Sequence, residues 1–283
     1  MPLPNSPLYH LKQLAQQAAS HPWIENFARF GYAAKGVVYF VVGLLAMQVA
    51  LNTGGQTTDT VGALVTIVNQ PFGEFLLSLI AIGLVGYVLW RIIQAVFDPD
   101  HSDKKTSAKR IVQRMGYGFS AIAYGSLAWT AVELITGTAN TSGSNIDDWT
   151  ARFIGHPLGR GLVGLAGLMA IAVGISYLYR AYKADFQHRF RQDRMSRAEQ
   201  QWAKWLGQLG IAARGIVFGI IGLFLVLAAL HSNASQARGF GGVLATLARQ
   251  PFGSWILGAV ALGLIAYSIY CLIQAGYRRI NLP

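Results

Sequence analysis

Six long apolar stretches, separated by short polar connections, dominate the pattern of the chain. Each approaches or exceeds the roughly 20 residues that a helix needs to span the hydrocarbon core of a bilayer. The pattern therefore predicts an all-α polytopic membrane protein with six transmembrane helices. The predicted spans are residues 30–51, 71–90, 116–135, 161–179, 211–230 and 251–275.

The spans belong to three repeats of one two-helix unit. We number the repeats unit 1 (27–98), unit 2 (112–186) and unit 3 (206–278). Their opening sequences are GYAAKGVVYFVVG from Gly31, GYGFSAIAY from Gly116 and GIAARGIVFGIIG from Gly210. A QPFG or HPLG turn precedes each second span, and proline suits the first turn of a helix. The stretches before these turns are too short to span and predict interfacial or re-entrant pieces. They are residues 61–68, 149–154 and 243–248.

Composition and charge placement favour the membrane over other partners. Apolar residues make up 53% of the chain and charged residues only 12%, about half the usual charged share. The net charge of +11 would suit nucleic acid, but most Lys and Arg residues lie in short connections beside the spans. There they orient helices and meet anionic headgroups. The exceptions on the opposite side are Arg152, Arg160, Arg238 and Arg249. This asymmetry predicts both termini in the cytoplasm, anionic lipids of the cytoplasmic leaflet as partners, and no nucleic acid.

Two spans per unit bring every unit into the membrane in the same direction, so the repeats are parallel and imply a pseudo-threefold axis along the membrane normal. We expect the first span of each unit to line this axis, because it carries small residues at seven-residue spacing that permit close approach. These residues are Gly36, Gly43, Ala121, Ala128, Gly215 and Gly222. The second spans are expected on the outside, with Trp90, Tyr179 and Tyr270 as anchors at headgroup depth.

Four segments lie outside the repeats. Residues 1–26 have apolar residues at helical spacing and predict a short amphipathic helix on the membrane surface. Residues 99–111 form a cytoplasmic linker, and 279–283 form a tail. Residues 187–205 predict a basic amphipathic helix on the inner leaflet, and the alternative is a solvated extension of the fourth span.

Two cations interrupt apolar spans at equivalent places: Lys35 in unit 1 and Arg214 in unit 3, where unit 2 has Ser120. Two interpretations stay open. Both side chains face the axis and attract an anion or a lipid phosphate near the cytoplasmic side, or both snorkel to the headgroups. The linker adds further candidates for binding lipid phosphate: Arg189, Arg191, Arg194 and Arg197.

The sequence carries no enzyme signature. It has no His or Cys at metal-ligand spacing inside a span, no phosphate-binding loop and no nucleophile elbow, so we predict no metal, cofactor or catalytic residue. No charged residue occupies the centre of a predicted span, which argues against an ion-coupled pump. We therefore predict a non-catalytic scaffold or lipid-binding membrane protein. A passive channel for a small solute or ion along the axis is the alternative, and protein partners and oligomeric state stay open.

The repeated opening sequence resembles a bacterial membrane-protein family catalogued as domain of unknown function twelve-oh-six. Its members look like three tandem two-span units that open with Arg-x-Gly-Tyr-Ala-Ala-Arg/Lys-Gly-x-x-Tyr. Unit 1 matches this pattern from Arg29 to Tyr39, and the QPFG turns of units 1 and 3 fit as well. Unit 2 departs, with Ser120 in place of the basic residue and Leu158 in the turn. The resemblance implies a protein of the bacterial inner membrane and no particular activity.

Overall fold

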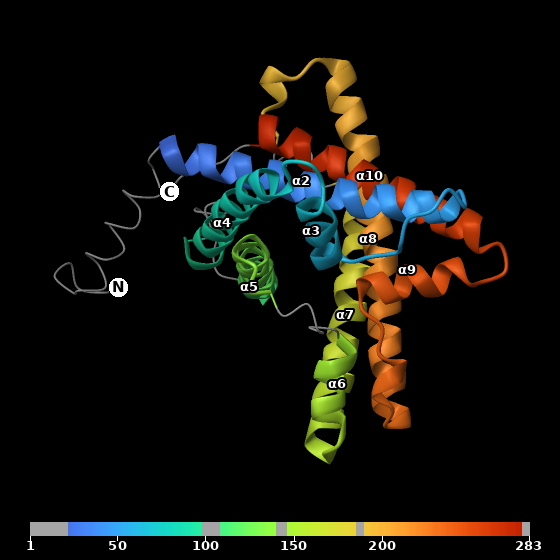
Figure 1. Cartoon of the computed structure of the whole chain (residues 1–283). Helices are drawn as coiled ribbons and strands as arrows, with labels where there is room; N and C mark the ends of the chain where they lie inside the picture. Colours follow the sequence, from blue (N-terminus) through green and yellow to red (C-terminus); the bar gives the residue numbers. More distant parts are fainter. Residues whose placement is uncertain (1–21, 98–107, 140–145, 185–189, 279–283) are drawn as a thin grey trace, which may run out of the picture.

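The computed structural model describes residues 22–97, 108–139, 146–184 and 190–278, which are largely helical (Figure 1). Six long helices correspond to the predicted spans: α2 (Pro22–Ala50), α4 (Gly73–Phe97), α5 (Ala108–Thr136), α7 (Pro157–Lys183), α8 (Arg197–His231) and α10 (Gly253–Tyr277). All six are long and apolar enough to cross a membrane, which confirms the all-α, six-span class. The predicted helix before Pro22, most of the linker 99–111 and the tail lie outside the described residues.

A short helix precedes the second long helix of each unit. These helices are α3 (Thr60–Val68), α6 (Ile146–Ile154) and α9 (Phe240–Ala248). In units 1 and 3 the joining turn places Phe72 and Phe252 in the left-handed region, at φ 61° and 60°. The next residue must be glycine, because a Cβ on Gly73 would lie 2.3 Å from the carbonyl oxygen of Val68. The QPFG sequence is therefore a tight turn between two helices.

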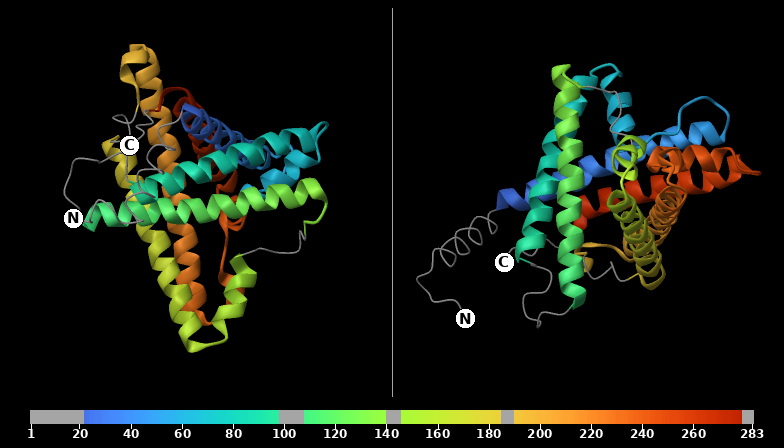
Figure 2. Two further views of the ribbon diagram at one scale, coloured as in Figure 1. Left: turned by 90° about the vertical axis from the view of Figure 1, so that its left-hand side faces the viewer. Right: turned by 90° about the horizontal axis from the view of Figure 1, so that it is seen from below.

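The six long helices pack as three pairs that run in different directions (Figures 1 and 2). The pairs are α2 with α10, α4 with α5, and α7 with α8. Each pair joins the first long helix of one unit to the second long helix of another, so the chain closes when α10 packs on α2. Within units 1 and 3 the two long helices also pack together, α2 on α4 and α8 on α10. The three units thus have the predicted pseudo-threefold arrangement.

The small-residue faces of the first long helices pack against long helices of neighbouring units, and their lining of the axis stays a prediction. Gly36 and Gly43 face α10, Gly215 and Gly222 face α7, and Ala121 and Ala128 are buried on α5, which packs on α4. The approach is close enough that a Cβ on Gly222 would lie 2.5 Å from the carbonyl oxygen of Gly167. Small residues therefore permit close pairing of helices from different units.

Two of the three second long helices, α4 and α10, are not on the outside, whereas α7 is the least buried of the six long helices. In α10, 56% of the most apolar stretch is buried within the protein, the highest value of the six. Trp90 and Tyr270, expected at the lipid headgroups, are only 0% and 4% exposed, and Tyr179 alone of the three lies on the surface. The reason is that α4 and α10 each lie between the first long helix of their own unit and that of another.

The basic linker also differs from the prediction. From Arg197 onward it is the first part of α8, an extension of the fifth span, and neither a separate surface helix nor an extension of the fourth. A capping box starts this helix: the Ser196 hydroxyl accepts from the Glu199 amide, and the Glu199 carboxylate accepts from the Ser196 amide. Trp202 and Trp205 are exposed on this extension.

Unit 2 differs from units 1 and 3 in its internal packing. A Cβ on Gly31 would lie 2.5 Å from the Tyr87 amide nitrogen, and one on Gly210 would lie 2.4 Å from the Tyr267 Cα. The equivalent glycine of unit 2, Gly116, has nothing within 4 Å of such a Cβ. Among the described helices, α5 and α7 do not pack along each other. We call the region between them the unit 2 seam.

Candidate functional site

Two cationic side chains lie buried at the middle of long helices. Lys35 of α2 is 3% exposed and Arg214 of α8 is 7% exposed, so neither snorkels to the surface. Both stand near helix midpoints because α2 begins at Pro22 and α8 at Arg197, well before the predicted starts. Both cations therefore lie deeper in their helices than the predicted starts at residues 30 and 211 implied. An ionisable residue at such a position marks a functional site by default.

Lys35 is held by three tyrosines from three different helices. Its Nζ donates to the Tyr87 hydroxyl of α4 at 3.0 Å. The same Nζ lies 4.8, 5.0 and 5.2 Å from the ring centroids of Tyr87, Tyr124 and Tyr267, which belong to α4, α5 and α10. These are cation–π distances. The lysine thus connects the α2–α10 pair to the α4–α5 pair.

Arg214 has a similar aromatic surrounding. It donates to the Tyr267 hydroxyl at 2.5 Å. Its guanidinium carbon lies 4.6–5.5 Å from the centroids of four rings: Tyr39, Tyr177, Phe218 and Tyr267. Tyr267 therefore lies beside both Lys35 and Arg214 and separates two like charges.

A third cation, Arg91 of α4, completes the group and was missed from the sequence. Its Nε donates to the Tyr87 hydroxyl at 2.8 Å, and its guanidinium donates to the Gln94 side-chain oxygen at 3.0 Å. The guanidinium also lies 5.1 Å from the Tyr117 ring. The Tyr87 hydroxyl thus accepts from both Arg91 and Lys35.

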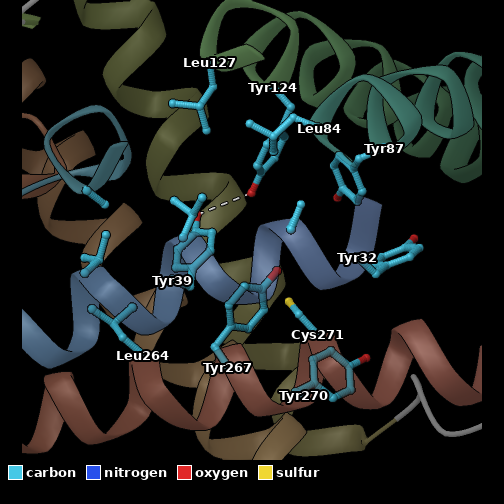
Figure 3. Packing of buried hydrophobic residues seen from close by; sticks show 14 of the residues in the cluster. Tyr32, Tyr39, Leu84, Tyr87, Tyr124, Leu127, Leu264, Tyr267, Tyr270 and Cys271 are labelled. Carbon is cyan, nitrogen blue, oxygen red and sulfur yellow. Dashed lines mark hydrogen bonds between the residues drawn. The ribbon is translucent and has the colours of Figure 1, made fainter. Parts of the chain in front are cut away.

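Figure 3 shows the tyrosines of this region projecting from different helices toward one another. The hydroxyls of Tyr39 and Tyr124 meet at 3.5 Å, and the Tyr87 and Tyr124 rings lie edge to face at 4.7 Å. We define the cation–tyrosine cluster as Lys35, Arg91 and Arg214 together with Tyr39, Tyr87, Tyr124, Tyr177 and Tyr267. Its members come from all six long helices, so the cluster lies where the three pairs meet.

The cluster has an unbalanced positive charge. No Asp or Glu is among the buried residues of the described part of the chain. An isolated buried charge costs several kcal/mol, whereas a desolvated cation–π contact returns about 2 kcal/mol. Tyrosines therefore offset part of the cost. The Arg214 Nε is buried and has no hydrogen-bond partner among the described residues, so one donor stays free.

The cluster repeats in units 1 and 3 and is lost in unit 2. Lys35 with Tyr87 and Arg214 with Tyr267 are equivalent pairs. Gly174 of α7 meets Gly215 as Ser268 of α10 meets Gly36, so position 173 is equivalent to 267. Unit 2 thus has Ser120 for the cation and Val173 for the tyrosine. Loss of both partners together indicates that cation and tyrosine act as a pair.

The linker arginines lie apart from this cluster. Arg191 forms an ion pair with Glu25 at 3.1 Å, and its amide donates to the Tyr277 carbonyl, which ties the linker to α2 and α10. Arg194 and Arg197 are exposed near the start of α8. The remaining candidate, Arg189, lies outside the described residues. The predicted phosphate-binding residues therefore form two groups, one buried and one on the surface.

The sequence signal that would have found Tyr87 and Tyr267 is the matching of units 1 and 3, whereas the position equivalent to Arg91 in unit 3 holds Cys271 and gives no such signal. Tyr87 and Tyr267 stand at equivalent places after the QPFG turns, as Lys35 and Arg214 do after the opening glycines. No group of three His, Cys, Asp or Glu residues that could hold a metal ion occurs among the described residues. Chemically, the cluster offers positive charge and hydroxyl donors in an aromatic surrounding, which suits an anion.

The domain of unknown function DUF1206 matches the chain three times, at residues 30–98, 115–184 and 209–278, and the chain belongs to this family. The three matches coincide with the three structural units. A Bacillus subtilis (strain 168) protein described as uncharacterized protein YxxB is 36% identical over 261 residues, which cover 92% of this chain and 93% of that protein. No solved structure matches the chain. Neither similarity assigns an activity.

Proposed function

We propose that the protein is a non-catalytic membrane protein that binds the phosphate of an anionic lipid of the cytoplasmic leaflet. The observation that carries this proposal is the burial of Lys35 and Arg214 in one cluster with the half-buried Arg91, without a buried carboxylate among the described residues. Three cations held together at a cost in solvation require a counter-charge, and a phosphate supplies it through charge-assisted hydrogen bonds.

The position of the surface arginines supports the same ligand. Arg194 and Arg197 are exposed beside Trp202 and Trp205 on the α8 extension. Basic residues with exposed aromatic neighbours suit an anionic headgroup layer, and each cation near such a surface contributes about 1 kcal/mol of attraction. They would raise the local concentration of the lipid that the buried cluster binds.

A passive channel along the pseudo-threefold axis has less support. The side chains of Tyr39, Tyr124 and Tyr267 are buried where the three pairs meet (Figure 3). A conducting path would require these aromatic rings to move apart. No observation on the described residues favours that rearrangement.

The test compares lipid retention in neutralised and charge-preserving variants. Protein purified in a mild detergent is mixed with phosphatidylglycerol and phosphatidylcholine, and bound lipid is measured by native mass spectrometry. Wild type should retain phosphatidylglycerol. The double variant Lys35→Met with Arg214→Met should retain at least roughly tenfold less of this lipid. The exchange variant Lys35→Arg with Arg214→Lys should retain it, because both charges remain. Arg249→Gln removes one exposed charge and is the control.

A second measurement covers the case in which the neutral variant does not fold. Thermal unfolding of wild type is followed while either lipid is added. A ligand at 100 times its dissociation constant stabilises by about 2.7 kcal/mol, so phosphatidylglycerol should raise the melting temperature by several degrees and phosphatidylcholine should not. Equal retention of both lipids by all variants, with equal melting temperatures, contradicts the proposal.

A further inference from the structure

We infer that the unit 2 seam is the lateral access route through which a phospholipid brings its phosphate to the cation–tyrosine cluster. This inference rests on the proposed function and adds where the ligand enters and how it lies. The phosphate would meet Lys35 and Arg214, and the acyl chains would lie between α5 and α7.

The first argument is steric. In units 1 and 3 a glycine faces an alanine across the within-unit contact: a Cβ on Gly83 would lie 2.5 Å from the Ala34 Cβ, and one on Gly263 would lie 2.3 Å from the Ala213 Cβ. In unit 2 the equivalent positions hold two large side chains. They are Phe119 in the opening sequence and Met169 after the turn. Two large residues cannot replace a glycine–alanine contact, so α5 and α7 stay apart.

The second argument is the position of the cluster relative to the seam. Each helix that borders the seam contributes one tyrosine over one cation: Tyr124 of α5 lies over Lys35, and Tyr177 of α7 lies over Arg214. Arg214 also has a buried Nε that donates no hydrogen bond to any described residue. The tyrosines of the two helices that border the seam therefore contact both cations, and a phosphate that displaced their rings would find an unused donor on Arg214.

The third argument concerns the walls of the seam. Phe119 is 62% exposed, Met169 is 48% exposed and Val173 is 40% exposed. These apolar side chains suit acyl chains and do not suit a free aqueous anion. Charge at the inner end and apolar walls together match an amphiphile with one negatively charged head.

The experiment uses the full-length protein in vesicles of phosphatidylcholine with a minor fraction of phosphatidylglycerol that carries a photoreactive diazirine near the glycerol. After irradiation, labelled peptides are identified by mass spectrometry. Labels should appear on α5 around Ser120 and on α7 around Val173. Excess unlabelled phosphatidylglycerol should reduce this labelling roughly tenfold, and excess phosphatidylcholine should not.

Two variants with matched controls sharpen the test. Val173→Trp fills the seam and should lower phosphatidylglycerol labelling and retention by roughly tenfold. Leu168→Trp adds the same side chain to another exposed position of α7 and should leave both unchanged. Because both positions are exposed, both variants should keep wild-type helicity by circular dichroism and a single monodisperse peak on size exclusion.

The outcomes separate this inference from the proposed function. Retention of phosphatidylglycerol that depends on Lys35 and Arg214, with labels confined to other helices, overturns the lateral route and leaves the proposed function standing. Cross-links across the seam between two copies of the chain also overturn it, because a second copy would then be the occupant. Absence of any specific retention overturns both.

Discussion

The contact between the two long helices of one unit is close in units 1 and 3 and missing in unit 2. All three units carry the opening glycine, yet Gly31 and Gly210 touch a neighbouring backbone whereas Gly116 does not. The difference lies in the partner positions, where unit 2 has Phe119 and Met169 in place of alanine and glycine. A small residue on one helix therefore creates a contact only when the facing residue is also small.

The same comparison shows which contacts unit 2 lacks and which it shares with units 1 and 3. Unit 2 lost the cation–tyrosine pair at Ser120 and Val173, and it also lost the within-unit contact. It kept the contacts that join it to the other units, α4 with α5 and α7 with α8. The ring of helices thus stays connected while one of its three internal contacts is open.

The largest expected effect concerns the opening glycines. Gly31→Leu or Gly210→Leu places a side chain against backbone atoms that cannot move away, and should destabilise by about 3 kcal/mol or more. Gly116→Leu meets open space and should change stability by less than about 0.5 kcal/mol. Thermal unfolding in detergent measures both, and equal losses in all three variants would contradict the steric comparison.

Substitution of a glycine at the contacts between units should lower stability nearly as much. A Cβ on Gly222 would lie 2.5 Å from the Gly167 carbonyl oxygen, so Gly222→Leu should cost about 2–3 kcal/mol. Gly219→Leu, on the same helix, has nothing within 4 Å of its Cβ and is the matched control. If the two variants have the same melting temperature, the helix pairs are less tightly packed than the structure indicates.

A smaller effect is expected for the hydroxyls of the cluster. Tyr267→Phe removes the acceptor of Arg214 and should cost about 1–2 kcal/mol, because a buried charged donor is left unpaired. Tyr182→Phe changes a largely exposed tyrosine of α7 and should have no measurable effect. Melting temperatures with and without phosphatidylglycerol are compared, and the Tyr267→Phe loss should shrink when the lipid is present. A loss that lipid does not alter would argue that Tyr267 has only a structural role.

The smallest effect on stability is expected when small residues are restored at the contact between α5 and α7 of unit 2. The same variant is the sharpest test of the comparison. Phe119→Ala with Met169→Ala restores small residues on both helices and should change stability by less than about 1 kcal/mol, because both side chains are exposed. Spin labels at Trp129→Cys and Leu162→Cys, both exposed positions, report the separation of α5 and α7. The distance should shorten in the rebuilt variant. An unchanged distance would mean that Phe119 and Met169 do not hold the helices apart.

The six spans, the three units and the tight turns could be predicted from the sequence because each depends on neighbouring residues. An apolar run of sufficient length specifies a transmembrane helix wherever it packs. The QPFG turn follows from a left-handed phenylalanine and a glycine that touches the preceding helix. The equivalence of Lys35 and Arg214 was likewise visible as a repeat.

Only the tertiary structure decided what each face contacts. Gly36 and Gly215 predict close packing against another helix. The spacing of these glycines along the sequence does not tell whether that helix lies across the axis or belongs to another unit. Trp90 and Tyr270 look like headgroup anchors until α4 and α10 are seen between two other helices. The cation–tyrosine cluster joins residues from six helices that are far apart along the chain, and no local pattern encodes such a meeting. The physical reason is that a helix propensity is local, whereas burial and charge pairing depend on which surfaces the whole chain brings together.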